Sequence, residues 1–383
     1  MSDILILEPC VKDYAWGNDY FIADLLELEK NGPRAELWVG AHKQGSAVVK
    51  DSGERLCDYL DRNPDFAGCN ADAFPYLLKI LAIAQSLSIQ CHPDAEQAKA
   101  GFEAELPKHQ AIDRKNWNYQ DPNPKAEMLY ALTPVTAMCG FRSFEEAEKL
   151  MKTAVSVFYS DHISEIGSVF ELFDKLYRMD EEALSFAQAE LLRNCELLPE
   201  DVQAVVKELC DMYFGDPGVF APLLLNIIHL EPGQAVYLKP RVLHAYISGN
   251  GVELMNNSDN VLRAGLTQKH MDLDELERVM LHDSYIPAPM SGHIDDGGVH
   301  FVCEGGFTLT AMKDGSYVNR INGPKTLICT EGCAEINGVF LQKGQCCIVG
   351  SSVEELSVRA ERASVFMASV NQTNTFVKIL TLC

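Results

Sequence analysis

The segment Leu87–Pro93 combines polar side chains that could do chemistry with a spacing that would gather them. If this segment is a strand, alternate side chains point to opposite faces, so Ser88, Gln90 and His92 share one face, about 6–7 Å from one to the next. The opposite face is apolar. A half-buried strand whose polar face simply meets water would show the same pattern, so the spacing alone leaves both interpretations open.

Two other segments place polar side chains two residues apart. Lys125 and Glu127 stand just before an apolar run, and His244 and Tyr246 follow the rigid turn at Lys239–Pro240. On a strand, each pair would share one face. Taken singly, the first pair is typical of an ion pair at a strand end, and a lone histidine such as His244 is usually structural.

Taken jointly, these segments offer a set of metal-binding groups. Two imidazoles, one carboxylate and one amide oxygen form a mixed nitrogen and oxygen set that suits zinc and leaves a coordination position for water. An iron oxygenase would favour a set richer in histidine, and an amide ligand fits that chemistry poorly. The four candidate ligands are Gln90, His92, Glu127 and His244.

A fourth segment, Asn256–Lys269, could bind an anion. Its density of Asn, Ser and Asp is typical of a loop, in which Arg263 and Lys269 could hold a negatively charged group. The 383 residues include 32 Lys and Arg against 55 Asp and Glu, which gives a net charge of −23. A phosphorylated ligand would therefore need such a locally basic pocket. A solvated loop without a ligand is the simpler alternative.

The composition narrows the class of protein. A net charge of −23 repels polyanions, so we expect neither nucleic acid nor an anionic membrane as a partner. The longest apolar run, Phe220–Leu230, is about half a membrane span, and the N-terminus lacks the pattern of a secretory signal. Thirteen cysteines without a CxxC pair indicate reduced thiols. We therefore expect a cytoplasmic protein.

The elements that must position these side chains follow a β–α–β order. A β-rich pattern runs to about residue 142, where Ser143 and Glu146 form the signature of a helix capping box. A helical block rich in Glu, Ala and Leu follows to about Phe214, and short strands return after Leu223. Three more helices are expected, at Asn18–Leu28, Ala95–Ala104 and Asp272–Leu281.

The last part of the chain predicts a separate β block. A Gly- and Pro-rich stretch at residues 287–298 is typical of a linker, and Asn337-Gly338 between two apolar runs marks a hairpin turn. We therefore expect a discontinuous β-rich core of residues 1–142 and 223–290, a helical insertion of residues 143–222, and a C-terminal β domain of residues 291–383.

Several longer strings carry a resemblance to a known family. Tyr14-Ala15-Trp16-Gly17, ELWVGAH at 36–42, LSIQCHP at 87–93, the Lys125-x-Glu127 segment, HAYISGNGVELM from residue 244 and NNSDNVLRAGLTQKH from residue 256 follow one another in the order seen in type I phosphomannose isomerases. LSIQ-x-HP together with SDN-x-x-R-x-GLT-x-K is highly specific. The chain is therefore identified as a member of this family, and its polar strand face as functional.

The resemblance implies a mainly β fold: a cupin-like jelly-roll catalytic core, a helical domain and a second jelly-roll-like β domain at the C-terminus. It implies one zinc per chain on the four ligands above, and interconversion of mannose 6-phosphate and fructose 6-phosphate. Arg263 matches the family's active-site arginine, and Lys79, Ser88 and Lys269 match residues associated with substrate phosphate. Other residues that line the site match Trp16, Lys125, Tyr246, Glu253 and Asp259.

This chemistry gives each group a task. An aldose–ketose isomerase opens the sugar ring, moves a proton from C2 to C1, and stabilises the enediol oxygens in between. Zinc and Arg263 would stabilise the oxygens. The proton needs a base, for which Lys125 is a candidate because nearby cations would disfavour its charged form, and Glu253 is the acidic alternative.

One departure from the family pattern concerns the base. The family usually has His-Lys-Pro-Glu where this chain has Pro124-Lys125-Ala126-Glu127, so a ring-opening role of that histidine would pass to another group, such as Asp259 with water. The changed backbone could also shift Lys125. The alternative function is therefore a non-catalytic, metal-dependent protein that binds sugar phosphate. The sequence does not determine the oligomeric state, although a monomer is plausible.

Overall fold

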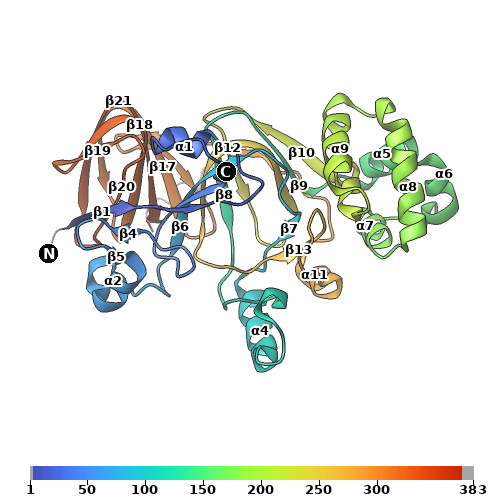
Figure 1. Ribbon diagram of the computed structural model, residues 1–383, viewed down its shortest axis with the longest axis horizontal. Coiled ribbons are helices and arrows are strands. Elements are labelled where there is room, and N and C mark those ends of the chain that lie inside the picture. Colours follow the sequence, from blue (N-terminus) through green and yellow to red (C-terminus); the bar gives the residue numbers. More distant parts are fainter. Residues whose placement is uncertain (1–2, 373–383) are drawn as a thin grey trace.

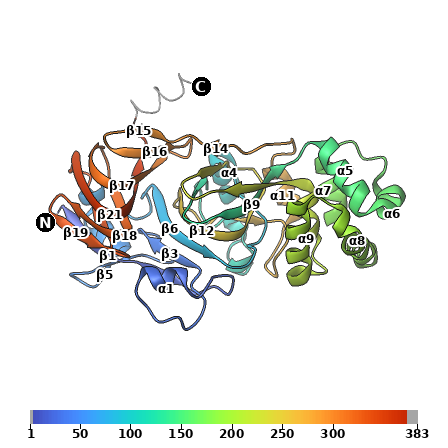
Figure 2. The same cartoon turned by 90° about the horizontal axis from the view of Figure 1, so that it is seen from above.

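The protein consists of two large antiparallel sheets side by side and a group of helices at one end. The computed structural model describes residues 3–372. Figures 1 and 2 show the C-terminal sheet at one end, the second sheet in the middle and helices α5–α9 at the other end. The expected fold class, mainly β with a helical insertion, is confirmed.

The central sheet has eleven strands, and the strand β12 (His244–Asn256) organises it. One half of β12 pairs with β6 and β8, and the other half pairs with β7 and β9, so the sheet curves around a single long strand. Its other strands are β2 (Cys10–Lys12), β3 (Glu36–Val39), β6 (Tyr76–Ile83), β7 (Gln90–Cys91), β8 (Glu127–Ala131), β9 (Val135–Phe141), β10 (Leu225–Leu230), β11 (Ala235–Leu238), β13 (Leu262–Arg263) and β14 (Pro289–Met290).

The second sheet has ten strands and combines both ends of the described chain. Strands near the N-terminus join it through the pairing of β1 with β20, so this sheet extends across the boundary expected at residue 291. Its strands are β1 (Ile4–Glu8), β4 (Val48–Val49), β5 (Glu54–Arg55), β15 (His293–Asp295), β16 (Gly298–Val302), β17 (Phe307–Arg320), β18 (Lys325–Ile336), β19 (Val339–Gln342), β20 (Cys346–Val349) and β21 (Glu355–Val370).

The turn predicted at Asn337-Gly338 is confirmed. Ile336 and Val339 are register partners on β18 and β19, so the turn has two residues. Asn337 has φ 45° and Gly338 has φ 85°, the positive values that a tight hairpin of this kind requires.

The two sheets share one apolar core. Tyr76 on β6 is fully buried and its hydroxyl donates towards the carbonyl oxygens of Pro324 and Ala368, at 2.9 and 3.0 Å. The ring of Tyr130 on β8 packs edge-on against Phe301 and Phe366. Because these contacts join residues about 170–290 positions apart, the C-terminal sheet is part of the support of the central one.

The helical insertion begins where the capping signature predicted. Ser143 caps the first helix, its Oγ accepting from the backbone N–H of Glu146 at 3.2 Å. The same hydroxyl, rather than the backbone N–H of Ser143, contacts the Glu146 carboxylate. The insertion contains α5 (Phe144–Ala154), α6 (Ser156–Phe158), α7 (Val169–Tyr177), α8 (Glu181–Asn194), α9 (Glu200–Tyr213) and α10 (Ala221–Leu224).

Helices outside the insertion are shorter than expected in two of three cases. The helix predicted at Ala95–Ala104 is confirmed as α4 (Ala95–Glu105), with a full capping box at Asp94. The other two form only a central turn or two of the expected ranges: α1 (Phe21–Leu25) and α11 (Leu273–Val279). Two further helices are α2 (Leu56–Arg62) and α3 (Pro64–Ala67). Within residues 3–372, no helix is both long and apolar enough to cross a membrane.

The helical insertion supports one loop of the central sheet. Tyr177 on α7 donates its hydroxyl to the carbonyl of Ala264 at 2.7 Å, and Asp216 accepts from the backbone N–H of Thr267 at 3.2 Å. Between them Gly265 has φ 97°, and a Cβ there would lie 2.6 Å from the Asp216 carboxylate. The segment after Arg263 is therefore held by the insertion rather than left as a free loop.

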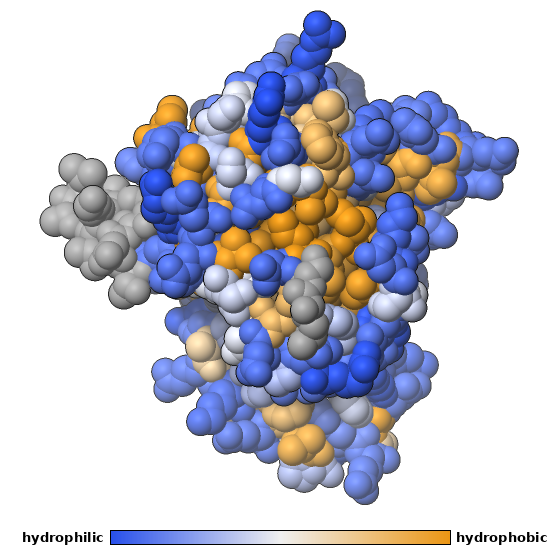
Figure 3. Space-filling view, turned by 90° about the vertical axis from the view of Figure 1, so that its left-hand side faces the viewer, coloured by the Kyte–Doolittle hydropathy of each residue, from blue (hydrophilic) through white to orange (hydrophobic). Residues whose placement is uncertain are grey.

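The end of the molecule that carries the C-terminal sheet has both apolar and polar surface. In Figure 3, hydrophobic side chains gather at its centre and hydrophilic ones surround them.

The C-terminal strands bury a charge. Lys325 on β18 is inaccessible to solvent, and its ammonium donates to the carbonyl of Val353. Burial lowers the pKa of Lys325 to about 8, with Glu354 partly opposing the shift.

Replacing Lys325 with Met should stabilise the protein at neutral pH. Below pH 8 the folded state must hold a poorly paired buried ammonium, so the apolar variant should gain about 1 kcal/mol or more in the free energy of unfolding. As pH rises from 8 towards 10.5, the unfolded state binds more protons than the folded state, and the wild type should recover the difference. Chemical denaturation at pH 7 and pH 10 measures both values, with Lys313→Met as an exposed control. Equal gains at the two pH values would contradict this explanation.

Candidate active site and metal centre

Strands β7, β8 and β12 bring the predicted metal ligands together. His92 Nε2 lies 3.3 Å from Glu127 Oε1, and His244 Nε2 lies 3.2 Å from Glu127 Oε2. All three side chains are buried, and their ligand atoms lie within 4.8 Å of one another. One carboxylate therefore faces two imidazole nitrogens in a space that suits a single metal ion.

The outer nitrogen of each imidazole is oriented by a backbone carbonyl. His92 Nδ1 lies 2.7 Å from Asn260 O, and His244 Nδ1 lies 2.9 Å from Val242 O. A carbonyl only accepts, so each ring carries a proton on Nδ1, and in the neutral form each Nε2 presents a lone pair towards Glu127. Burial, followed by repulsion from Lys125, lowers the pKa of His92 to about 4. The lone pairs and the carboxylate therefore form an electron-rich pocket that fits a cation.

Gln90 lies beside this cluster. It is the register partner of His244 on one side and of Arg263 on the other, and residues directly opposite in antiparallel strands point to the same face. The expected strand over Leu87–Pro93 is shorter than predicted, since only Gln90–Cys91 pair as β7. Its alternation persists, with Ile89 buried on the apolar side. The role of Gln90 as the fourth ligand stays a prediction.

Lys125 keeps a place at the cluster despite the altered segment around it. Its Nζ lies 2.8 Å from Glu127 Oε1 and 3.4 Å from His92 Nε2. The neighbouring Ala126 donates its backbone N–H to the side-chain oxygen of Asn256 at 3.0 Å, a bond that proline at this position could not make. Burial disfavours the ionised form of Glu127, but the attraction of the Lys125 ammonium outweighs burial and holds the pKa of Glu127 well below its usual range.

A second buried group of charges lies next to the first. Lys79 Nζ is 3.0 Å from Glu253 Oε2 and 3.7 Å from Glu36 Oε2. Tyr246 donates its hydroxyl to Glu253 Oε1 at 2.9 Å. Burial raises the pKa of Glu253 above its usual value, although Lys79 partly opposes the shift. Lys79 is thus shared between two carboxylates.

A cavity of about 1020 Å³ opens beside both groups. It is large enough for a sugar phosphate, because ligand pockets typically measure about 300–1,000 Å³. Five predicted site residues are buried and are not among the residues that line it: His92, Glu127, His244, Tyr246 and Glu253. The other predicted site residues all line it: Trp16, Lys79, Ser88, Gln90, Lys125, Asp259, Arg263 and Lys269.

Arg263 and Lys269 give one wall of the cavity a positive charge. Neither forms an ion pair with a described residue, and Arg263 Nε is buried without a hydrogen-bond partner. Burial lowers the pKa of both side chains, and Arg263 adds to the effect on Lys269. Two cations on one wall, neither of them in an ion pair with a described residue, favour an anionic ligand.

The sequence interpretation did not assign roles to three polar residues on the wall. Glu36, His42 and Gln44 line the cavity next to Trp38. Glu36 and Trp38 alternate on β3, and this alternation within ELWVGAH was an available signal. No comparable pattern marks Gln44, which follows the strand in a turn.

Comparisons with known proteins agree with this geometry. Residues 4–144 match the family model described as phosphomannose isomerase type I, catalytic domain. Mannose-6-phosphate isomerase of Escherichia coli is 36% identical over 282 residues, covering 70% of this chain and 72% of the relative. The rat enzyme is 33% identical, covering 83% and 79%.

Solved structures extend the similarity to nearly the whole chain. A point mutant of phosphomannose isomerase from Salmonella typhimurium has a TM-score of 0.88 at 28% identity, covering 97% of this chain and 100% of that one. A zinc-bound mannose 6-phosphate isomerase has a TM-score of 0.86 at 28% identity, with the same coverage.

Replacing His244 with Ala should abolish metal binding. The change removes one imidazole that faces Glu127, and loss of one of so few protein ligands leaves an incomplete site. Metal analysis of the purified variant should find almost no zinc, whereas the wild type should carry about one per chain. His229→Ala, the same change at a histidine outside the cluster, serves as the control. Full zinc occupancy in His244→Ala would refute the assignment.

Proposed function

The chain belongs to the type I phosphomannose isomerase family, and from this premise we propose that it interconverts mannose 6-phosphate and fructose 6-phosphate as an aldose–ketose isomerase. The observation that carries the proposal is the buried His92–Glu127–His244 cluster beside a cavity with two uncompensated cations. Such a site can hold a metal ion that binds the sugar oxygens, and its positively charged wall can bind the phosphate.

The donor set of the cluster fits zinc. Its ligands would be His92, Glu127 and His244, with Gln90 as the fourth, because the two neutral imidazoles and the carboxylate already point at one another. When bound, zinc supplies a Lewis acid that polarises the oxygens on C1 and C2 of the sugar. Relatives solved with zinc support this cofactor.

We assign the cations of the cavity wall to different parts of the substrate. Arg263 is the register partner of Gln90, so we place it near the reacting carbons, where it stabilises negative charge on the enediolate. We assign Lys269 and Ser88, which line the same cavity, to the phosphate. Lys79 lines the cavity too, but two carboxylates share its ammonium, so we assign it to holding Glu253 more than to the phosphate.

Lys125 and Glu253 remain the two candidates for the base that moves the proton between C2 and C1. Lys125 lines the cavity and reaches the substrate directly. Glu253 is buried and does not line the cavity, but burial raises the pKa of its carboxyl above the usual value, which favours uptake of a proton. Trp16 completes the surroundings of the sugar, Tyr246 acts through its hydrogen bond to Glu253, and Asp259, ionised on the cavity wall, takes the ring-opening role.

The cysteines indicate the compartment of the protein. Twelve cysteines in the described residues are free, which supports a reducing compartment, and we propose the cytoplasm. The alternative function, a sugar-phosphate-binding protein without turnover, would explain the metal cluster. The isomerase is favoured because curated relatives that align with more than two thirds of the chain are named mannose-6-phosphate isomerase.

A coupled assay with mannose 6-phosphate tests the proposed function. Zinc-loaded protein should form fructose 6-phosphate and chelated protein should not. Arg263→Ala should lower kcat by about 10²–10³-fold, because it removes a charge that acts on the transition state, with zinc content unchanged. Arg278→Ala, at an exposed arginine, should match the wild type. Absence of turnover in zinc-loaded wild type would favour the binding protein.

Two substitutions decide between the candidate bases. Lys125→Met should abolish exchange of the C2 proton with deuterated solvent if the amine is the base, and Glu253→Gln should do so if the carboxylate is. NMR at C1 and C2 measures the exchange. Normal exchange in both variants would exclude both candidates.

A further inference from the structure

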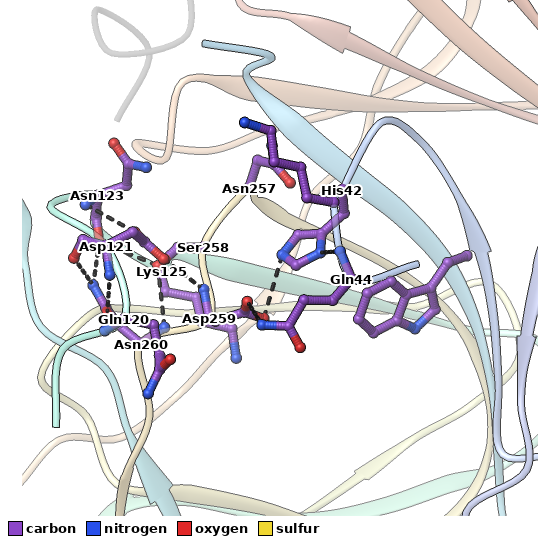
Figure 4. A network of polar contacts seen from close by, with 12 residues as sticks. His42, Gln44, Gln120, Asp121, Asn123, Lys125, Asn257, Ser258, Asp259 and Asn260 are labelled. Carbon is purple, nitrogen blue, oxygen red and sulfur yellow. Dashed lines mark hydrogen bonds and ion pairs between the residues drawn. The ribbon is translucent and has the colours of Figure 1, made fainter. Parts of the chain in front are cut away.

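A histidine outside the metal cluster lies against Asp259 on the cavity wall. His42 is 7% exposed, and its Nε2 is 3.3 Å from Asp259 Oδ1. Figure 4 shows the imidazole between Gln44 and Asp259, away from the labelled Lys125. The two residues lie more than two hundred positions apart in the chain, so only the fold brings them together.

The contacts of the imidazole determine where its proton lies. The backbone N–H of Gln44 donates to His42 Nδ1 at 3.2 Å, so this nitrogen must offer a lone pair. A neutral ring therefore carries its proton on Nε2 and donates it to Asp259. The ring edge also packs against Trp38 at 5.1 Å between centroids, with the planes at 84°. His42 is thus a fixed hydrogen-bond donor.

The Asp259 carboxylate is held from both sides. His42 donates to Oδ1, and Gln44 Nε2 donates to Oδ2 at 2.5 Å. The backbone N–H of Asp259 donates to Asp121 Oδ2 at 2.9 Å, which anchors the main chain. Each carboxylate oxygen receives one donor and retains capacity for a second, which substrate can supply. The carboxylate is therefore oriented without being saturated.

We propose that His42 is a positioning residue for ring opening: with Gln44 it holds the Asp259 carboxylate ready to accept the proton of the anomeric hydroxyl. This inference rests on the proposed function. In the step, the O1–H proton passes to Asp259, the C1–O5 bond breaks to leave a C1 aldehyde, and O5 takes a proton from water. Asp259 then gives its proton to the hydroxide that remains, which restores both the carboxylate and the water.

The charges around Asp259 suit this task. Burial opposes ionisation, but the His42 hydrogen bond and the attraction of nearby cations outweigh it, so the pKa of Asp259 is lowered and the carboxylate is ionised at neutral pH. Loss of the His42 donor should raise this pKa, which moves the acid limb of the kcat/KM profile to higher pH. The charged and titratable groups that act electrostatically on the carboxylate are His42, Lys79, Lys125 and, less directly, Tyr14, and the amide of Gln44 donates to it.

The test separates the donor from the bulk of the side chain. His42→Leu removes the donor, whereas His42→Gln places an amide N–H near the position of Nε2. Magnetisation-exchange NMR measures how fast the protein interconverts the α- and β-anomers of mannose 6-phosphate, a process that requires ring opening but no isomerisation. His42→Leu should be slower by about tenfold or more, with its acid limb about one pH unit higher, and His42→Gln should recover most of both.

Two controls accompany this test. Zinc content and the affinity for mannitol 1-phosphate, which has no ring to open, should be unchanged in both variants. Anomer interconversion and a pH profile in His42→Leu equal to wild type, or no recovery in His42→Gln, would overturn the inference. If His42→Leu does not fold, Gln44→Leu replaces it, because this change removes the donor to the other carboxylate oxygen. Gln44→Leu should slow anomer interconversion in the same way. An unchanged rate would overturn the inference that His42 and Gln44 together hold the carboxylate. Wild type that catalyses neither anomer interconversion nor isomerisation would instead refute the proposed function.

Discussion

The carboxylate of Glu127 is the point at which the elements of this protein meet. Its two oxygens face His92 and His244, and one of them also contacts Lys125. These residues come from strands and a loop that are distant in sequence, so the curvature of the sheet around β12 must be correct for them to converge. The buried Glu127 carboxylate depends on the Lys125 ammonium beside it, because loss of that cation leaves an unpaired buried charge.

The rest of the structure buries these side chains and fixes their orientation. Asn260 illustrates the means: its carbonyl orients His92, and its fully buried side chain bonds the backbone of residues 120–123. The helical insertion holds the segment after Arg263 through Tyr177 and Asp216. The C-terminal sheet contributes no residue to the cavity among those described, and it acts through the core it shares with the central sheet.

Local pattern predicted the parts of the site that lie on one strand or in one motif. The alternation in LSIQCHP placed Gln90 and His92 on one polar face, which the family resemblance marked as functional. The loop after Asn256 singled out Arg263 and Lys269, which line the cavity, and their binding of an anion stays a prediction. Pairings across the fold left no such signal. Lys79 with Glu253 and His42 with Asp259 depend on strand register and loop packing, and composition cannot show either. The boundary expected at residue 291 has the same limit. The pairing of β1 with β20 joins the two ends of the chain in one sheet, and no local pattern in the sequence marks such a long-range pairing.

The most direct test of the central role of the Glu127 cluster is to add zinc stepwise to metal-free wild-type protein and to measure isomerase activity after each addition. If this single cluster supports catalysis, activity should rise in proportion to added zinc and level off at about one equivalent per chain, with no activity before addition. Full activity in the metal-free protein, or a zinc-loaded protein that does not convert mannose 6-phosphate, would contradict this account.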